Sequence, residues 1–520
     1  MKGRFFLFWL LSGSLTACGG GSDSNSNSDT QTLGGLQGAE LKLDGSYFES
    51  KTVTATLTHP NSEVLSDARI SFQWFDEAGA IWGADSNKIQ LTASDIDKNI
   101  YATATVSIDG KDARQFTSPS FTVESKIDLL TFFDESYRMQ ISLGAAENDA
   151  WAVPESPWAA SGDDYIPTAV SDGKGNIIVA WQSEYSPDFG GEYDIVYSRS
   201  TDNGQTWSER SLLNAADTND SESDEDVSLA TDGNGTWVAV WSSNEDINGA
   251  GTDSDIVFVV STDNGETWTT PNWLNDYAMS ETKQDWQPRV KVFDNHWIVV
   301  WVSNFDLDGG ISSDRDILFS YSDDKGVSWS SPEYLNSAAQ SDLASDADYF
   351  PELDINANGI GAAIWSAHHG DDDLDIYAAI TSDFGKTWST SQRLNSYGAT
   401  DGTTHHDYAR HIEVSSTGKI VASWEGENPA NGTDSDAYYS FSEDTGMTWA
   451  VEQTLNTDAS LDNTQEEFVQ ISTDNSGSWY GLWSDAAGGL WMRRSNDLTN
   501  WSDAAKLSSD NEEGFEFLIH

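Results

Sequence analysis

One short motif, Ser/Thr-x-Asp-x-Gly-x-x-Trp, recurs along the chain at nearly constant spacing. It reads STDNGQTW from Ser200 and STDNGETW from Ser261, and it returns as SDDKGVSW, TSDFGKTW and SEDTGMTW. The five copies are 61, 61, 59 and 61 residues apart, and a worn copy, SNDLTNW, begins at Ser495. A repeat of this period constrains the fold more than any other feature, because every copy must build the same supersecondary unit.

Each repeat contains four short strand-like segments. Around the second copy they read VSLATD, WVAVWSS, DIVFVVS and NWLN. Six such units across residues 135–520 predict an all-β chain with a six-bladed β-propeller of four antiparallel strands per blade. The closure of the ring is left open. Residues 137–143 resemble a fourth strand and the C-terminal EGFEFLIH resembles a first strand, and a degenerate seventh blade is the alternative.

The residues of the motif suit a tight turn. The Asp carboxylate accepts N–H groups of the turn that follows it, and Gly adopts a backbone conformation that other residues reach only with strain. The Trp ring is expected to pack back into the blade. Because every copy shares these residues, we expect them to be structural: Asp202, Gly204, Trp207, Asp263, Gly265, Trp268, Asp324, Gly326, Trp329, Asp383, Gly385, Trp388, Asp444, Gly446 and Trp449.

These motifs resemble the Asp boxes, or BNR repeats, of sialidase-like propellers, and the resemblance covers residues 135–520. It implies a propeller fold and, in the family, hydrolysis of glycosides with the substrate carboxylate held by three arginines. The first of these lies in an R-I-P sequence. Here the sequence is YIP, so Tyr165 stands in place of that arginine. Arg289, Arg315 and Arg410 remain as arginines in first strands or variable loops, and the resemblance therefore favours the fold more than the activity.

The N-terminus has the composition of a targeting signal. Lys2 and Arg4 precede a short apolar run, and LTAC ends at Cys18, the single cysteine of the chain. This resembles a bacterial lipoprotein signal, which predicts a signal peptide at 1–17 and a flexible tether at 18–35 from a lipidated Cys18. An outer-membrane or cell-surface location follows. An ordinary secretory signal with a chance cysteine is the alternative.

Residues 36–125 read as a separate β-rich unit. Segments such as KTVTATLTH, RISFQWFDEAG and IYATATVSIDG alternate apolar and polar residues between turns. The stretch resembles the Ig-like modules of bacterial surface proteins, which implies a small β-sandwich. It carries no catalytic constellation, so we expect a spacer or an adhesive module.

The charge of the chain excludes some partners. There are 26 Lys and Arg against 86 Asp and Glu, a formal net charge of -60. Such a surface repels nucleic acid, and contact with a membrane is expected only through the lipid at Cys18. No cofactor is certain. Calcium is a candidate ligand of the acidic loops, although no loop has a complete EF-hand spacing.

Residues that one blade alone carries are the candidates for function. If the Asp boxes occupy one face, the loops on the opposite face are long and varied. Asp–aromatic–x–Pro motifs begin several first strands there, and five of the eight histidines fall in AHHGDDD and TTHHDYARH. The catalytic candidates are His406, Asp407, Tyr408 and Glu425; the ligand-binding candidates are Tyr165, Trp286, Arg289, Tyr349, Arg410, His368, His369 and His405.

Two functions fit these residues. The first is a surface lipoprotein whose propeller binds an extracellular glycan or a surface protein without turnover. The second is an exo-acting glycoside hydrolase of the sialidase superfamily, with its site around the same residues. The metal ligands and the ligand identity are unknown at this point.

Overall fold

The computed structural model divides the chain into two compact units. It describes residues 36–518 apart from short interruptions and the stretches 45–51, 81–85, 92–97, 108–113, 123–127, 134–138, 146–149, 152–163, 185–192, 214–222, 308–313, 336–346, 369–372, 400–404, 457–463 and 508–514. The predicted signal peptide, the tether and Cys18 lie outside the described residues. In the described part the fold is all-β, and the named helix is one turn of 3-10 helix, η7 (Tyr397–Ala399).

The first unit consists of two antiparallel sheets, whose strand orders are β1-β2-β5 and β4-β3-β6-β7, with β8 paired to β6. Trp74 in β3 is fully buried, and its indole N–H donates to the backbone oxygen of Ser86 at 3.0 Å. Small and branched side chains such as Ala102 and Val53 complete this core. The strands are β1 (Glu40–Asp44), β2 (Thr52–Thr58), β3 (Arg69–Asp76), β4 (Gly79–Ala80), β5 (Lys88–Gln90), β6 (Asn99–Ser107), β7 (Arg114–Thr117) and β8 (Phe121–Thr122).

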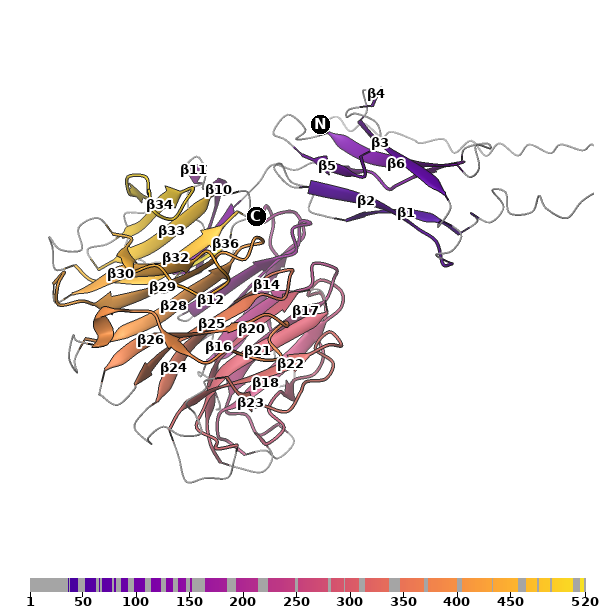
Figure 1. Ribbon diagram of the computed structural model, residues 1–520. Coiled ribbons are helices and arrows are strands. Elements are labelled where there is room, and N and C mark those ends of the chain that lie inside the picture. Colours follow the sequence, from indigo (N-terminus) through magenta and orange to yellow (C-terminus); the bar gives the residue numbers. More distant parts are fainter. Residues whose placement is uncertain are drawn as a thin grey trace, which may run out of the picture. The chain divides into compact units, whose positions relative to one another are not determined.

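The second unit is a series of four-stranded antiparallel sheets, one for each sequence repeat (Figure 1). In each sheet the strands follow chain order, as the repeat predicts. The six sheets are β12 (Asp164–Ser171), β13 (Ile177–Ser183), β14 (Asp194–Ser200), β15 (Ser211–Leu212); β16 (Asp224–Thr231), β17 (Trp237–Ser243), β18 (Asp255–Ser261), β19 (Asn272–Trp273); β20 (Asp285–Phe293), β21 (His296–Ser303), β22 (Asp316–Ser322), β23 (Glu333–Tyr334); β24 (Asp348–Ile355), β25 (Gly361–His368), β26 (Leu374–Thr381), β27 (Gln392–Arg393); β28 (Asp407–Val414), β29 (Ile420–Glu427), β30 (Ser435–Ser442), β31 (Gln453–Thr454); β32 (Glu466–Thr473), β33 (Trp479–Asp485), β34 (Gly489–Ser495) and β35 (Ala505–Lys506).

A seventh sheet of the same form joins the two ends of this unit. Its order is β36-β9-β10-β11, formed by β36 (Phe515–Leu518), β9 (Asp128–Phe133), β10 (Met139–Ala145) and β11 (Ala150–Trp151). The prediction of six sheets is therefore one too low, because this sheet lacks the repeated motif. The C-terminal segment does act as a first strand. Residues 137–143 instead overlap the third strand of the sheet.

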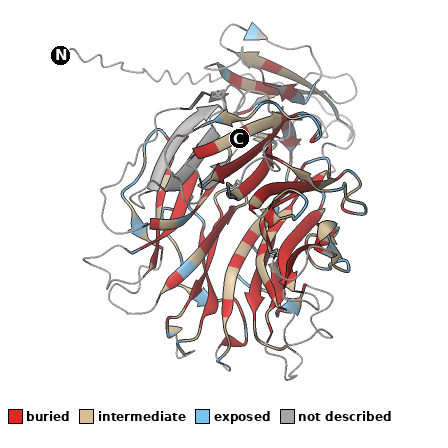
Figure 2. Ribbon diagram, turned by 90° about the vertical axis from the view of Figure 1, so that its left-hand side faces the viewer, coloured by how far each residue is buried: buried red, intermediate tan, exposed pale blue. Residues whose placement is uncertain are grey.

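The first strands of the seven sheets contact one another in chain order. Strand β36 completes the series, because it contacts both β32 and β12. The second strands of the repeat sheets are buried along nearly their whole length, and the third strands are mostly buried, as in β17 and β18; buried residues are red in Figure 2. These second strands are mostly apolar because neighbouring sheets cover both of their faces. The first strands alternate between buried and partly exposed residues.

The repeated motif forms the turn after the third strand. Asp202 accepts a hydrogen bond from the Thr206 N–H at 2.8 Å, and the Ser200 hydroxyl accepts one from the Gly204 N–H at 2.8 Å. The indole N–H of Trp207 donates to the Gly204 carbonyl at 2.9 Å. The Asp and Gly therefore act as local turn formers, as expected for structural residues.

A second repeated device joins neighbouring sheets. The side-chain amide of Asn395 donates to Asp375 at 2.7 Å and to Asp407 at 2.6 Å, which belong to adjacent sheets. Asn275 and Asn456 do the same for the carboxylates of their own sheet pairs. We call this the asparagine lock. It compensates pairs of buried carboxylates with charge-assisted hydrogen bonds.

The strand register fixes which end of each sheet carries the variable loops. Asp285 at the start of β20 lies opposite Ser303 at the end of β21, which lies opposite Asp316 at the start of β22. The Asp box follows Ser322, at the other end of β22. First-strand starts and Asp boxes thus occupy opposite ends of the sheets, which is the arrangement that the sequence predicts.

Candidate functional site

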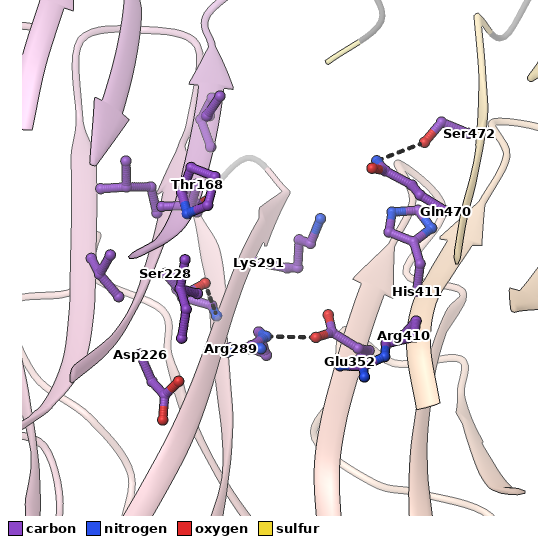
Figure 3. Close-up of a pocket in the computed structure, with 18 of the residues that line it drawn as sticks. Thr168, Asp226, Ser228, Arg289, Lys291, Glu352, Arg410, His411, Gln470 and Ser472 are labelled. Atoms are coloured by element: carbon purple, nitrogen blue, oxygen red, sulfur yellow. Dashed lines mark hydrogen bonds and ion pairs between the residues drawn. The ribbon is translucent and has the colours of Figure 1, made fainter. Parts of the chain in front are cut away.

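The first strands of the repeat sheets surround a cavity of about 680 Å3. We call it the channel cavity. Its lining comes from β12, β16, β20, β24, β28 and β32, and Figure 3 shows side chains from these strands facing one another across it. Since first strands alternate, every second residue points inward, and the inward positions here are mostly polar.

A β-bulge lies near the start of each first strand of the repeat sheets and shapes the end of the cavity that is nearest to these starts. In β24 the two residues between Tyr349 and Glu352 stand opposite one residue of β25, Trp365. Phe350 within this bulge has a positive φ of 53°, and the equivalent residues Ile166, Asp226, Gln287 and Phe468 also have positive φ values. A non-glycine residue rarely adopts this conformation. Because the bulge recurs in several sheets, it is a regular feature of the fold. It turns the side chains of these residues toward the cavity.

Two arginine–glutamate pairs lie at the channel cavity, and three of their four residues, Arg289, Glu352 and Arg410, line it. Arg289 Nε donates to Glu352 Oε1 at 2.7 Å across adjacent sheets, and Arg410 forms an ion pair with Glu425. The other Glu425 oxygen accepts the Phe468 backbone N–H at 3.1 Å. Glu425 is nearly inaccessible to solvent, so these bonds fix both its position and that of the Arg410 guanidinium.

Further along the strands, four titratable side chains gather. Lys291 Nζ lies 3.8 Å from Asp354 Oδ1, and Asp354 Oδ2 accepts the Val414 N–H at 2.6 Å. Burial, reinforced by Asp354 and opposed by Lys291, raises the pKa of Glu413 to about 8. Burial, together with the positive charge of Lys291, lowers the pKa of His411 to about 3. At neutral pH this group therefore holds a neutral imidazole and a protonated Glu413 beside the Lys291–Asp354 pair. Figure 3 shows two of its members, Lys291 and His411.

A continuous belt of rings lies at the first-strand starts and reaches the channel cavity through Phe350, Arg410 and Phe468. The ring of Tyr349 is 6.1 Å from Phe350, which is 5.8 Å from Tyr408. The Arg410 guanidinium lies 5.3 Å from the Phe468 ring. We define the aromatic belt as Trp286, Arg315, Tyr349, Phe350, His368, His406, Tyr408, Arg410 and Phe468.

The two histidines of the belt are held by backbone groups. His368 Nδ1 lies 3.0 Å from the Asp373 carbonyl, and His406 Nδ1 accepts the Leu374 N–H at 3.3 Å. Their rings are 6.3 Å apart, and His406 is also 6.3 Å from Tyr408. The structure therefore brings together residues from the two histidine-rich segments, as the sequence suggests.

Asp407 occupies a different environment from the other three catalytic candidates. It is completely buried, accepting the Tyr397 hydroxyl at 2.6 Å and the Asn395 amide. Equivalent carboxylates start the other first strands; Asp164 and Asp348 accept the indole N–H groups of Trp181 and Trp365. Asp407 thus belongs to the asparagine lock, while His406, Tyr408 and Glu425 lie on or beside the aromatic belt.

The remaining ligand-binding candidates are dispersed. Tyr165 lines the channel cavity from β12 and packs edge-on against Tyr193 at 5.6 Å. His405 is half-buried and, among the residues that the structure describes, makes no ring contact with the aromatic belt. His369 lies outside the described residues. Trp286, Tyr349, Arg410 and His368 are members of the aromatic belt, and Arg289 lies in the cavity wall.

Several residues of the site do not appear among the sequence candidates. Phe350 and Phe468 are bulge residues, and Glu352, Lys291 and Glu413 point into the channel cavity. A signal for them does exist. The first strands contain charged residues at alternate positions, as in Arg289 and Lys291, where an ordinary core strand would be apolar.

No metal centre is found in the described part of the chain, where no group of three His, Cys, Asp or Glu side chains is arranged to hold an ion. The acidic loops that suggested calcium fall partly outside it. No helix among the described residues is long and apolar enough to cross a membrane.

No protein-family model matches the chain, and no curated protein sequence matches it either. Solved structures with some similarity include the NanB sialidase of Streptococcus pneumoniae, at 12% identity and TM-score 0.41, covering 92% of this chain and 99% of that one. A PL25 ulvan lyase has 14% identity, TM-score 0.47 and coverages of 76% and 89%. An α-L-arabinanase of Penicillium chrysogenum has 14% identity, TM-score 0.39 and coverages of 68% and 93%. At these values the similarities carry no information about the activity of this chain.

Proposed function

We propose that this chain is a cell-surface lipoprotein whose second unit is a propeller that binds an extracellular glycan on the aromatic belt. Lipidation at Cys18 would anchor it, residues 18–35 would act as a tether, and the first unit, as an Ig-like module, would hold the propeller away from the membrane. The count of seven sheets with contacting first strands supports a closed ring of seven blades.

The observation that carries the proposal is the aromatic belt itself. Rings of Trp286, Tyr349 and Tyr408 stand at the first-strand starts beside hydrogen-bonding groups of His406 and Arg410. Sugars present C–H faces that pack on aromatic rings and hydroxyl groups that need donors and acceptors. Sites for small molecules generally combine an apolar wall with a few placed polar groups, and the aromatic belt has this composition.

Binding fits this geometry better than glycoside hydrolysis. A tyrosine nucleophile is activated by a lowered pKa or by an adjacent general base. Burial, together with the charge of Glu425, raises the pKa of Tyr408, so a neighbouring base would have to activate it. Glu425 is engaged by Arg410 and the Phe468 N–H, and Asp407 is buried in the asparagine lock. Hydrolysis stays the alternative, because Tyr408, His406 and Glu425 remain close enough to act on a bound sugar.

A glycan array followed by titration calorimetry tests the binding proposal. Trp286→Ala and Tyr408→Ala should each weaken binding of the best oligosaccharide about 10-fold or more, given about 1.5–3 kcal/mol for a buried aromatic side chain. Phe293→Ala is the matched control, because Phe293 is a partly exposed aromatic residue at the Asp-box end of β20. Equal effects of all three substitutions would contradict the proposal.

A turnover assay distinguishes glycoside hydrolysis from binding alone. The purified chain is incubated with the bound polysaccharides and with fluorogenic sialosides, with and without calcium, and product release is measured. We expect none. Release that Tyr408→Phe abolishes would establish the hydrolase. Palmitate labelling of cells that express the chain or Cys18→Ser tests the anchor, and labelling that persists in the variant would refute it.

A further inference from the structure

We propose that Arg315 is the anion-recognition residue of the aromatic belt, and that the glycan bound there carries a carboxylate or a sulfate ester. The inference depends on the proposed function, since it names the chemical class of the same ligand.

The three arginines near the first-strand starts are in different electrostatic situations. Arg289 pairs with Glu352 and Arg410 pairs with Glu425, so their charges are compensated within the protein. Arg315 forms no ion pair with any residue that the structure describes, although Asp314 and Asp316 flank it in the sequence. Both flanking carboxylates are buried, and the side chain of Arg315 is directed to the rings instead.

Two aromatic residues hold the Arg315 guanidinium. Its central carbon lies 4.8 Å from the ring centroid of Trp286 and 4.8 Å from that of Tyr349. The rings belong to β20 and β24, on adjacent sheets, so the arginine stands between two of the positions that a sugar would occupy. Cation–π contacts engage the face of a guanidinium and leave its in-plane N–H groups available.

The backbone of Arg315 is also fixed. Its carbonyl oxygen accepts the Asp348 N–H at 2.8 Å, which ties it to the start of β24, and the next residue, Asp316, begins β22. The position is thus set by two sheets and two rings. A positioned guanidinium loses little freedom on binding, and it can donate two parallel hydrogen bonds to a carboxylate or sulfate.

The strongly negative charge of the chain makes a positively charged side chain at the aromatic belt important for binding an anion. With 86 acidic against 26 basic residues, an anion is repelled by most of the surface. An acidic glycan therefore binds only where a local positive charge is available. Within the aromatic belt, Arg315 is the arginine whose charge is not already matched by a described carboxylate.

Titration calorimetry with the full chain tests the proposal with three probes of equal length. Tetragalacturonate carries carboxylates, a sulfated carrageenan tetrasaccharide carries sulfate esters, and cellotetraose is neutral. The variants are Arg315→Gln, which removes the charge, and Arg315→Lys, which keeps the charge but not the planar fork. Arg114→Gln is the matched control, because Arg114 also lies over an aromatic ring, Phe116, at 5.2 Å in the first unit.

We expect at least one acidic tetrasaccharide to bind more tightly than cellotetraose. Arg315→Gln should weaken that binding about 10- to 100-fold, as for a hydrogen-bonded charge pair, and leave any cellotetraose binding within about 2-fold. The affinity of Arg315→Lys for the acidic tetrasaccharide should lie between those of the wild type and Arg315→Gln. Arg114→Gln should leave this affinity unchanged. Binding of tetragalacturonate indicates a carboxylate ligand, whereas binding of the carrageenan tetrasaccharide indicates a sulfate ligand.

Two contrary results have different meanings. Binding of cellotetraose alone, or acidic binding that is unchanged in Arg315→Gln, overturns the role of Arg315 while the aromatic belt remains a glycan site. Failure of all three probes, together with an empty glycan array, refutes the proposed function and this inference with it. Matching melting temperatures of the three variants and the wild type show that the comparisons report on binding.

Discussion

Arg410 and Glu425 form an ion pair at the edge of the channel cavity, and Glu425 also accepts the Phe468 backbone N–H of the neighbouring sheet at 3.1 Å. One carboxylate thereby orients an arginine of the aromatic belt and joins two sheets. It is an acidic residue that serves the site by holding other groups.

Replacing Glu425 with Gln should destabilise the protein by about 1–3 kcal/mol and weaken glycan binding, because the charge that orients Arg410 is lost. Urea unfolding and calorimetry measure the two effects. Glu427→Gln is the control, since Glu427 lies two residues further along the same strand and is more exposed. Equal stability of the two variants would show that the Glu425 contacts contribute nothing.

The asparagine lock predicts a large effect from a small substitution. Asn395→Ala leaves Asp375 and Asp407 buried without the amide that they share, which should cost about 2–4 kcal/mol of unfolding free energy. Asn358→Ala, whose amide makes a long exposed contact of 3.4 Å with Ser416, should cost little. A loss below about 0.5 kcal/mol for Asn395→Ala would contradict the structural role of the lock.

The glycines of the Asp boxes should be required for space as well as for conformation. Gly385 has a φ of 76°, and a Cβ placed on it would overlap Ile298 of the preceding sheet. Gly477 has a positive φ of 117° with open space around its Cβ position. Thermal unfolding should therefore show Gly385→Ala to be less stable than Gly477→Ala. Similar melting temperatures would mean that backbone strain alone matters.

The titratable group in the channel cavity makes stability depend on pH in a defined window. Glu413 has an ordinary pKa of 4.5 that rises to about 8 in the fold, so the folded protein keeps this proton more firmly than the unfolded chain. Its contribution to stability is complete below pH 4.5 and is lost as the pH rises to about 8. His411, whose pKa falls from 6.5 to about 3, acts in the opposite direction between those two values.

The window from pH 6.5 to 8 lies above the titration of His411, and the Glu413→Gln variant separates Glu413 from other buried carboxyl groups with a raised pKa, such as Asp354 and Asp224. Glu413 alone should lower the stability of the wild type across this window by about 1–2 kcal/mol, and Glu413→Gln should remove that part of the fall. Urea titrations at fixed ionic strength measure this. A wild-type profile that rises through the window, or one that Glu413→Gln leaves unchanged, would disprove the raised pKa of Glu413.

The sequence predicts the repeated parts of this molecule well, because repetition reveals which residues every sheet needs. Asp202 and Trp207 could be assigned a turn role from the motif, and Asp407 could have been recognised as structural from its counterparts Asp285 and Asp348. The seventh sheet is only the alternative that the sequence offers to a count of six, because its strands carry no motif. β36 and β9 meet only when the chain closes on itself.

The site was predictable in part. The Asp–aromatic–x–Pro motif that several first strands share indicates Tyr349, and the histidine-rich segment TTHHDYARH indicates His406 and Tyr408. All three lie together in the aromatic belt. Phe350 and Phe468 were missed because their direction depends on the positive φ of a bulge, which no sequence period reveals. The contrast between Arg315 and Arg410 depends on which carboxylate lies nearby. Glu425 reaches Arg410 from the neighbouring strand β29 of the same sheet, and the strand register that brings the two together cannot be read from the sequence.

A crystal structure of the full chain with its best-bound oligosaccharide would show whether the aromatic belt is the glycan site. We predict sugar rings packed on Trp286, Tyr349 and Tyr408, with an acidic group within hydrogen-bonding distance of Arg315. An oligosaccharide bound instead at the Asp-box end, or on the first unit with the aromatic belt empty, would contradict the claim that the belt is the glycan site.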